Sequence, residues 1–484
     1  MRGGSIAARA ALALLLMVGF YLMALGMVAG LLYIPYAEWT YAGRLHIKVA
    51  LGCILGAGAI GVAIIPRPDR FDDPGPELTA KRFPLLFERL SKVAQRSEQS
   101  MPRHVYLVPD MNAFVANRGG VMGFGSRRVM GIGLPLMQVL SVSQLEAVLA
   151  HEFGHYHGGD TMLGPWVYKT RAAIGRTLSS LGDEGILHLP FRWYGNMFLR
   201  LTLAVSRAQE YAADRLAATL VGSGHLAEGL KRVHAAAPAF DAYWSDEAAP
   251  VLEGGYRVPL MSGFHRFLAV PKIEEAMGGF LKQALAEEQT EKYDTHPALK
   301  DRLAALEGLP AGEPDDGRPA VTLLGDTAGA EQLLLEFLGA TDLTSIAWEQ
   351  VGQSVLLPRW QKQVQGLGAL LEGTPLAETP QTMRHKQRDI VDAFIAQPGL
   401  ELPADVVDQL AANAVGAALC VTLARLGFEL DAPVGEPVVF RRGQAELQPF
   451  ALTHALVSPD AEEAAFLSAL SDAGVADQNL SFLE

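Results

Sequence analysis

The pattern of apolar and polar positions separates a hydrophobic N-terminal part from a longer, mixed remainder. Residues 10–37 contain no charged side chain, and this run exceeds both the roughly 20 residues of a membrane span and a signal-peptide core. A second apolar run covers residues 49–65. Together they predict a transmembrane helical hairpin within residues 1–70, with spans of about 10–36 and 48–65. A cleaved signal peptide and a buried core helix are the alternatives for the first and second run.

Positive residues flank this hairpin unevenly. Two precede it and four follow it closely, whereas two lie in the connection: Arg2 and Arg9, then Arg67, Arg70, Lys81 and Arg82, against Arg44 and Lys48. Because cytoplasmic flanks carry an excess of Lys and Arg, everything after residue 66 is expected on the cytoplasmic side, as in a bacterial inner-membrane protein.

Shorter elements follow the hairpin. A helix is expected around residues 78–98, and strands at 105–108 and 127–134. The glycine-rich residues 119–125 lack the context of a phosphate-binding loop, so they predict a hairpin connection. These small strands, followed by long helical patterns, predict an α+β fold that is mostly helical.

Two later segments bear on the domain organisation. Residues 161–220 are helical in pattern, but five Lys and Arg residues between positions 169 and 200 argue against further spans. A Pro-, Gly- and Asp-rich stretch at 309–320 predicts a boundary, after which residues 321–484 are expected to form a helical accessory domain of unknown role.

Composition narrows the partners. The formal net charge is −13 and no domain-sized basic patch occurs, so a nucleic-acid partner is not expected. The only cysteines, Cys53 and Cys420, lie far apart and exclude a disulfide framework. A lipid bilayer is the partner that the N-terminal hairpin predicts.

Candidate chemistry begins with the sequence His-Glu-Phe-Gly-His at residues 151–155. Ser141 or Ser143 can cap a helix here, because Gln144 and Glu146 stand three residues later. At 3.6 residues per turn, His151 and His155 project within roughly 40° of each other, so both imidazoles can reach one metal ion. Glu152 projects beside them, where it can contact a metal-activated water. Structural histidines on a core helix are the alternative.

A catalytic zinc site takes three protein ligands and leaves a position for water. Glu210 is the candidate third ligand, and Asp214 lies four residues later on the same helical face, with Arg207 one turn before. Asp214 can accept the second N–H of a ligand histidine and fix its tautomer. The sequence therefore predicts one Zn²⁺ per chain, bound by His151, His155 and Glu210.

These motifs resemble the integral-membrane metallopeptidases that include HtpX and the CAAX prenyl endopeptidases, a gluzincin family. The resemblance covers roughly residues 80–310 and rests on four motifs in the same order: His151-Glu152-x-x-His155, Glu210-x-x-x-Asp214, Asn112-Ala113-Phe114, and Thr295-His296-Pro297 with Arg302. It implies a zinc metallopeptidase domain at about 71–310, with Glu152 as catalytic acid/base. It also implies that Asn112 and His296 line the cleft, His296 as a candidate oxyanion donor. Many members carry two more spans before the third ligand, which the charges noted above do not favour here.

The resulting hypothesis is a membrane-anchored endopeptidase that acts on polypeptides, membrane-associated or misfolded ones above all. The strand at 127–134 is expected to be an edge on which extended substrate pairs its backbone. An inactive zinc-stabilised scaffold and an intramembrane protease are the alternatives; the intact Glu152 argues against the first, and the distance from the spans against the second. His157 is expected to be a surface residue and Asp160 a helix cap.

Overall fold

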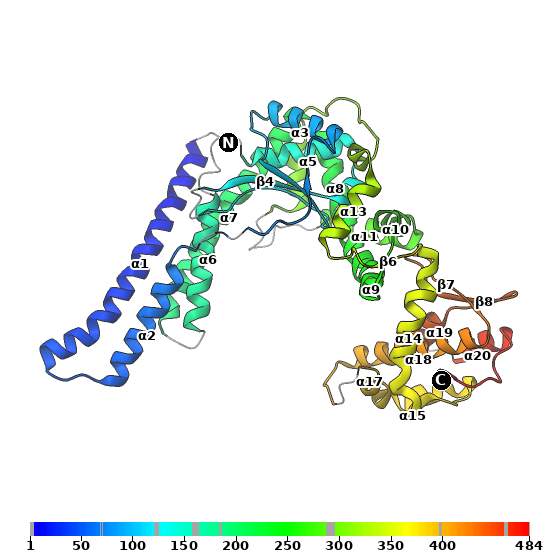
Figure 1. Ribbon diagram of the computed structural model, residues 1–484. Coiled ribbons are helices and arrows are strands. Elements are labelled where there is room, and N and C mark those ends of the chain that lie inside the picture. The colour runs from blue at the N-terminus through cyan, green and yellow to red at the C-terminus, as the bar shows by residue number, and fades with distance from the viewer. Residues whose placement is uncertain are drawn as a thin grey trace. The chain divides into compact units, whose positions relative to one another are not determined.

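A computed structural model describes residues 4–67, 69, 71–120, 125–156, 164–182, 186–286, 296–395, 399–458 and 463–483. His157, Asp160 and Thr295 lie outside these residues. The described part is mostly helical, with small sheets, as expected from the sequence (Figure 1).

The chain folds into two compact units that interleave along the sequence. The first unit comprises residues 1–237 and 277–337, and the second comprises residues 238–276 and 338–484. The sequence pattern predicts consecutive domains at 71–310 and 321–484 instead, and these limits stay a prediction.

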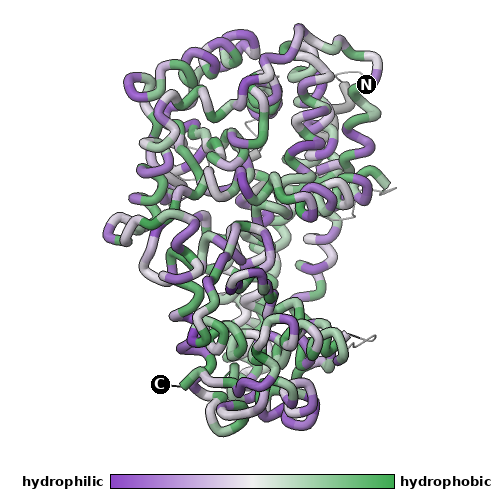
Figure 2. The backbone as a smooth tube through the Cα atoms, turned by 90° about the vertical axis from the view of Figure 1, so that its right-hand side faces the viewer, coloured by the Kyte–Doolittle hydropathy of each residue, from purple (hydrophilic) through white to green (hydrophobic). Residues whose placement is uncertain are grey.

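The predicted N-terminal hairpin is present as two packed helices, α1 (Gly4–Ala42) and α2 (Ile47–Ile64) (Figure 1). Both are long and apolar enough to cross a membrane. Figure 2 colours the backbone of the chain by hydropathy. Four exposed aromatic residues lie near the C-terminal end of α1: Tyr33, Tyr36, Trp39 and Tyr41. Aromatic residues prefer the membrane interface, so this end of α1 fits a headgroup region.

Two further helices pack against this hairpin, α6 (Gly164–Leu181) and α7 (His188–Leu220). Phe20 of α1 packs edge-on against Phe191 of α7, and the hydroxyl of Tyr194 donates to the backbone carbonyl of Leu16, 2.6 Å away. Arg176 of α6 donates to the carbonyl of Ala63 in α2 at 3.1 Å. Neither α6 nor α7 is among the candidate spans.

One four-stranded sheet belongs to the first unit, with the strand order β1-β2-β4-β3. Its strands are β1 (Glu77–Leu78), β2 (His104–Val108), β3 (Ala113–Arg118) and β4 (Arg127–Gly133). The predicted strands at 105–108 and 127–134 are present, but they pair in parallel as β2 and β4. The glycine-rich segment joins β4 to β3, a strand that the sequence pattern did not reveal.

One expectation about this region was wrong, and one expected helix is present with a later start. Strand β4 pairs on both sides, with β2 and with β3, so it offers no free edge to a substrate; β3 is the edge strand instead. The helix expected at 78–98 is α3 (Pro84–Arg96), because residues 77–78 pair with β2 and Pro84 starts the helix. Proline is favoured in the first turn, where its missing N–H would have no helical partner.

The first unit contains four more helices and one 3₁₀ turn. They are α4 (Leu134–Val139), α5 (Val142–Gly154), α12 (Leu299–Leu306), the 3₁₀ turn Ala320–Leu324 and α13 (Thr327–Phe337). Two more helices are shared between the units, α8 (Ser223–Tyr243) and α11 (Pro271–Ala286).

The second unit is built around α18 (Ala404–Arg425), which is buried along most of its length. The other helices of this unit are α9 (Ala249–Glu253), α10 (Leu260–Leu268), α14 (Leu357–Val364), α15 (Gly368–Leu371), α16 (Thr379–His385), α17 (Gln387–Ile395), α19 (Pro449–Ala455) and α20 (Glu463–Asp472). Of these, α14, α16, α17 and α19 pack against α18. Its strands are β5 (Tyr256–Arg257), β6 (Thr344–Ser345), β7 (Glu429–Asp431), β8 (Val439–Arg442) and β9 (Ala445–Leu447).

Helix α18 is also the third helix apolar enough to cross a membrane by length and composition. However, 67% of its apolar window is buried inside the protein, against 22% for α1 and 33% for α2. Its apolar residues therefore already have protein neighbours, whereas those of α1 and α2 are left for lipid.

Candidate metal centre

Helix α5 carries the His-Glu-Phe-Gly-His sequence and begins at a well-formed cap. The side chain of Ser141 accepts from the backbone N–H of Gln144, and the Gln144 side chain accepts from the backbone N–H of Ser141. This capping box fixes the start of the helix and so the direction in which later side chains project. Ser143 does not cap; it accepts from the backbone N–H of Asp316.

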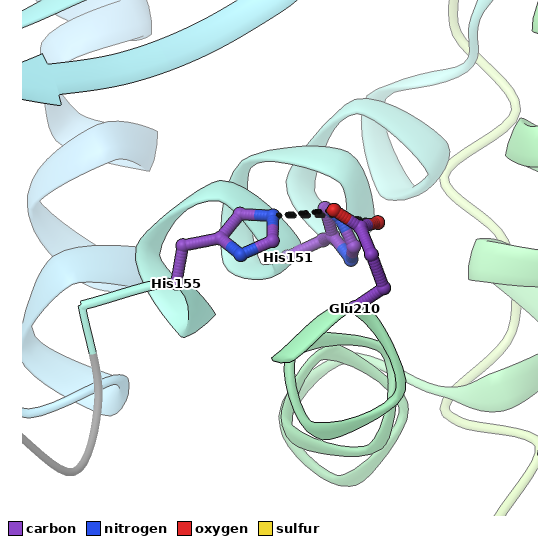
Figure 3. Close-up of side chains that lie close together, drawn as sticks. All are labelled: His151, His155 and Glu210. Atoms are coloured by element: carbon purple, nitrogen blue, oxygen red, sulfur yellow. Dashed lines mark hydrogen bonds and ion pairs between the residues drawn. The ribbon is translucent and has the colours of Figure 1, made fainter. Parts of the chain in front are cut away.

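The candidate ligands come together from two helices, α5 and α7. Figure 3 shows His151 on α5, and His155 at the C-terminal cap of α5, facing Glu210 on α7. The Nε2 atoms of the two histidines lie 3.2 Å apart. The carboxylate of Glu210 lies 3.5 Å from each of them, through Oε2 to His151 and Oε1 to His155.

These distances fit a small metal ion. In a tetrahedral site with bonds of about 2.0–2.1 Å, the ligand atoms are separated by about 3.4 Å. The three residues form the one group of His, Cys, Asp and Glu side chains found to be close enough for a metal among the described residues. In addition, Oε2 of Glu210 is buried and accepts no well-oriented hydrogen bond from the described residues. The nearest nitrogen outside the histidine pair is Nδ1 of His296, 3.1 Å away. A buried carboxylate oxygen without a well-oriented donor is costly, and a cation would satisfy it.

A close helix crossing holds this arrangement together. A Cβ atom on Gly154 would lie 2.8 Å from the Cα of Ala213 in α7. No side chain fits at such a distance, so only glycine lets the two helices approach at this point. Because Ala213 is one turn after Glu210, this contact brings the carboxylate of α7 to the histidines of α5.

Asp214 and Arg302 support the first histidine. The Nδ1 atom of His151 lies 2.9 Å from Oδ1 of Asp214, the arrangement expected when an imidazole N–H donates to a carboxylate. Arg302 of α12 donates twice to the same carboxylate, over 2.9 Å and 2.6 Å. Both Asp214 and Arg302 are buried, so each depends on the other for its charge partner.

The ionisation of the histidines reflects these neighbours. Burial alone would lower the pKa of His151, but the carboxylates of Asp214 and Glu210 outweigh it and raise this pKa to about 9. His155 has no such partner beyond Glu210, and burial together with the charge on His151 lowers its pKa to about 4.

The pKa values of the carboxyl groups in the site are shifted in opposite directions. Burial raises the pKa of Glu152, which accepts a hydrogen bond from the backbone N–H of Val115 on β3. Burial would also raise the pKa of Glu210, but the imidazoles of His151 and His296 hold it well below its usual range. The pKa of Asp214 is also lowered, because the hydrogen bonds from Arg302 and His151 outweigh the effect of its burial. Two carboxyl groups with separated pKa values are typical of sites where one acts as a base.

The other predicted site residues lie around this centre or apart from it. His296 places Nδ1 3.1 Å from Oε2 of Glu210 and keeps 61% of its side chain exposed. Asn112 lines a cavity of about 490 Å³ together with His151, Glu152 and His296. Arg207 is half-buried, and no hydrogen bond or ion pair joins it to the site within the described ranges.

Sequence reasoning gave no role to three groups that contact the site. Arg302 entered only as part of a motif, and nothing in one sequence indicates that it pairs with Asp214. The backbone of Val115 and the hydroxyl of Tyr156, which donates to the Val115 carbonyl at 2.9 Å, were also missed. Tyr156 directly follows His155, but its partner lies on a strand that was not predicted.

Two imidazoles, a converging carboxylate and an adjacent half-buried glutamate, on a helix packed against a small sheet, are an arrangement typical of metallopeptidases. Residues 80–309 match the model of peptidase family M48. The chain is 23% identical to a "Protease HtpX homolog" of Pelotomaculum thermopropionicum over 254 residues, which is 48% of this chain and 78% of the relative. A second "Protease HtpX homolog", of Thermodesulfovibrio yellowstonii, is 24% identical over 263 residues, with the same shares. Residues 80–309 therefore form a metallopeptidase domain similar to this family, and the chain resembles these HtpX homologues over about half of its length. No solved structure matches it.

Proposed function

We propose that the protein is a zinc-dependent endopeptidase of the membrane, with His151, His155 and Glu210 as the metal ligands and Glu152 as the general base. The observation that carries this proposal is the convergence of the three ligand side chains at separations of 3.2–3.5 Å, directly beside the half-buried Glu152. Two neutral imidazoles and one carboxylate are a ligand set that zinc uses in hydrolytic enzymes.

Zinc held by His151, His155 and Glu210 would supply a Lewis acid that makes water more acidic and polarises the scissile carbonyl. Glu152 would act as the general base that takes a proton from the attacking water and passes it to the leaving amine. Its burial supports this role, because a raised pKa makes the carboxylate a better proton acceptor near neutral pH. Asp214 and Arg302 act through His151, whose ring they orient.

His296 and Asn112 border the same cleft. The partly exposed ring of His296 makes it a candidate donor to the oxyanion that forms during hydrolysis. Asn112 lies beside the start of β3 and lines the cavity, where its amide can bind the backbone of a substrate.

An extended substrate would pair with the edge strand β3. Val115 turns its N–H toward Glu152 and its carbonyl toward Tyr156, so the outer edge of β3 faces the catalytic helix. Ala113 and Asn117, two residues away on either side, present their backbones to the same edge. Backbone pairing is independent of side-chain identity, which favours a broad range of polypeptides, including misfolded membrane proteins.

The orientation of the membrane hairpin decides on which side of the membrane the protein meets its substrates. The Lys and Arg residues that flank α1 and α2 favour a bacterial inner membrane with the catalytic centre on the cytoplasmic side. Protease added to spheroplasts should then leave residues after 66 intact until the membrane is permeabilised. Digestion of these residues in sealed spheroplasts would reverse the orientation.

The catalytic assignment is tested by Glu152→Gln in the full chain. General acid–base catalysis contributes about 100- to 10,000-fold, so cleavage of denatured casein should fall at least about 100-fold while bound zinc, measured by mass spectrometry, is retained. Glu88→Gln, an exposed position on α3, is the matched control. Retained cleavage in the Glu152→Gln protein would remove Glu152 from the mechanism, and unchanged zinc content in a Glu210→Ala protein would remove Glu210 from the ligand set.

A further inference from the structure

Tyr156 lies just beyond the catalytic helix and has no part in the mechanism proposed above. It follows His155 at the end of α5, and its backbone N–H donates to the carbonyl of Phe153 over 3.0 Å. This tight turn extends the helix, so Tyr156, four residues after Glu152, projects from the same face. The general base and this tyrosine are therefore neighbours on one side of α5.

Both side chains contact the same residue of the sheet, Val115 on the outer edge of β3. The hydroxyl of Tyr156 donates to the Val115 carbonyl over 2.9 Å, and the Val115 N–H donates to the carboxylate of Glu152. In an antiparallel ladder, every second residue of an edge strand turns its N–H and its C=O away from the partner strand, as Val115 does here. One strand residue thus joins the two side chains, and a restraint on its carbonyl also restrains its N–H.

The ring of Tyr156 is anchored as well. It is half-buried, and the guanidinium of Arg128 on β4 lies 4.3 Å from its centroid, within the range of a cation–π contact. Arg128 is held in turn, because its Nη1 donates to the side-chain oxygen of Gln99 and to the carbonyl of Ser100, each over 3.3 Å. With ring and hydroxyl both engaged, Tyr156 has little freedom to rotate and forms a fixed brace on β3.

We infer that Tyr156 is a positioning residue that orients Glu152 through the backbone of Val115. This inference rests on the proposed function, because it takes Glu152 as the general base. A carboxylate has two oxygens, so Glu152 can accept from Val115 and still reach the attacking water. A general base works only within hydrogen-bond reach of the proton it takes. A fixed Val115 N–H limits the rotation of the Glu152 carboxylate and keeps it beside the metal centre.

Tyr156→Phe removes the hydroxyl and keeps the ring that Arg128 contacts. In the full-length, zinc-loaded protein in detergent, kcat for a quenched fluorescent peptide should fall about 3- to 10-fold, the loss expected for one hydrogen bond. KM and bound zinc should stay unchanged, because a positioning residue binds neither the substrate nor the metal. Tyr41→Phe, at an exposed position of α1, is the matched control.

Arg128→Met tests the anchor of the ring. Loss of the cation–π contact should lower kcat about 2- to 5-fold, again without a change in KM. Successive side chains of a strand point to opposite faces of the sheet, so the exposed Arg127 is the matched control, and Arg127→Met should leave kcat unchanged. Equal losses in the two arginine variants would contradict the brace.

A double-mutant cycle decides whether Tyr156 acts through Glu152. Added to Glu152→Gln, the Tyr156→Phe substitution should cause little further loss of kcat, because the group that Tyr156 positions has already lost its function. The full loss in that background would overturn the inference. So would an unchanged kcat in Tyr156→Phe alone, or a joint loss of zinc and activity, which a merely structural role would produce.

Hydrogen–deuterium exchange separates this inference from the proposed function. The Val115 amide should exchange faster in Tyr156→Phe than in the unmodified protein, and this measurement requires no cleavage. Faster exchange in a protein that cleaves no peptide would remove the proposed function and leave the brace intact. Unchanged exchange in an active enzyme would overturn the brace and leave the proposed function intact.

Discussion

The two units of the protein use their interiors differently. In the first unit the buried residues include the side chains of Glu146, His151, Glu210, Asp214 and Arg302. In the second unit the buried polar side chains among the described residues are three threonines, and its core is otherwise apolar. Burying a charge is expensive unless it is paired, so a protein keeps buried charges where a task requires them. The contrast separates a unit built around a reaction from a unit built around packing.

The largest test of this contrast removes a buried charge from the first unit. Arg302→Met keeps much of the volume of the side chain but leaves the buried carboxylate of Asp214 without its bidentate partner. Breaking a buried ion pair in this way costs about 3–5 kcal/mol, which a denaturant titration of the detergent-solubilised protein measures. Zinc affinity should also fall about 10- to 100-fold, because Asp214 orients His151.

Arg215→Met is the matched control for that substitution. Arg215 is an exposed residue of α7, one position after Asp214, so its loss should change stability by less than about 0.5 kcal/mol. If both variants were equally stable, the buried charges of the first unit would not be coupled as the contrast requires.

The second test changes volume without charge in the second unit. Leu419 of α18 is 1% exposed and belongs to the apolar core. Leu419→Ala should destabilise by about 2–5 kcal/mol through the cavity it leaves. Leu419→Met conserves volume and should cost less than about 1.5 kcal/mol. The ratio of the two effects, measured by the same titration, checks that packing alone decides this position; equal losses would contradict it.

The smallest expected effect lies at the surface of the second unit. Arg441 pairs with Asp431 and with Glu446, but all three side chains are about half exposed, at 47%, 51% and 49%. Ion pairs of this kind contribute about 0–1 kcal/mol, because water screens the charges. Arg441→Ala should therefore shift the unfolding midpoint only slightly. A loss comparable to that of Arg302→Met would show that charge matters to both units alike.

Local patterns in the chain predicted much of this structure. The apolar runs predicted α1 and α2, and strands β2 and β4 were expected close to their observed bounds. Ser141 with Gln144 predicted the start of α5. Helical periodicity placed His151 near His155, and Glu210 on the same face as Asp214. All of these rest on relations between residues that are close along the chain.

The errors have a common origin. Strand β3 escaped notice because a short, half-buried edge strand has little apolar alternation of its own. Consequently β4 was wrongly expected at the edge of the sheet.

The sequence by itself determined the class of protein, because two histidines one helical turn apart and a helical glutamate are recognisable from spacing alone. The tertiary structure decided which groups meet: the crossing of α5 and α7 at Gly154, the pairing of Arg302 with Asp214, and the cavity that Asn112 and Glu152 line together. Each of these joins residues that are distant in sequence. Spacing along a chain fixes what one helix presents, whereas contacts between helices depend on packing that no local pattern encodes.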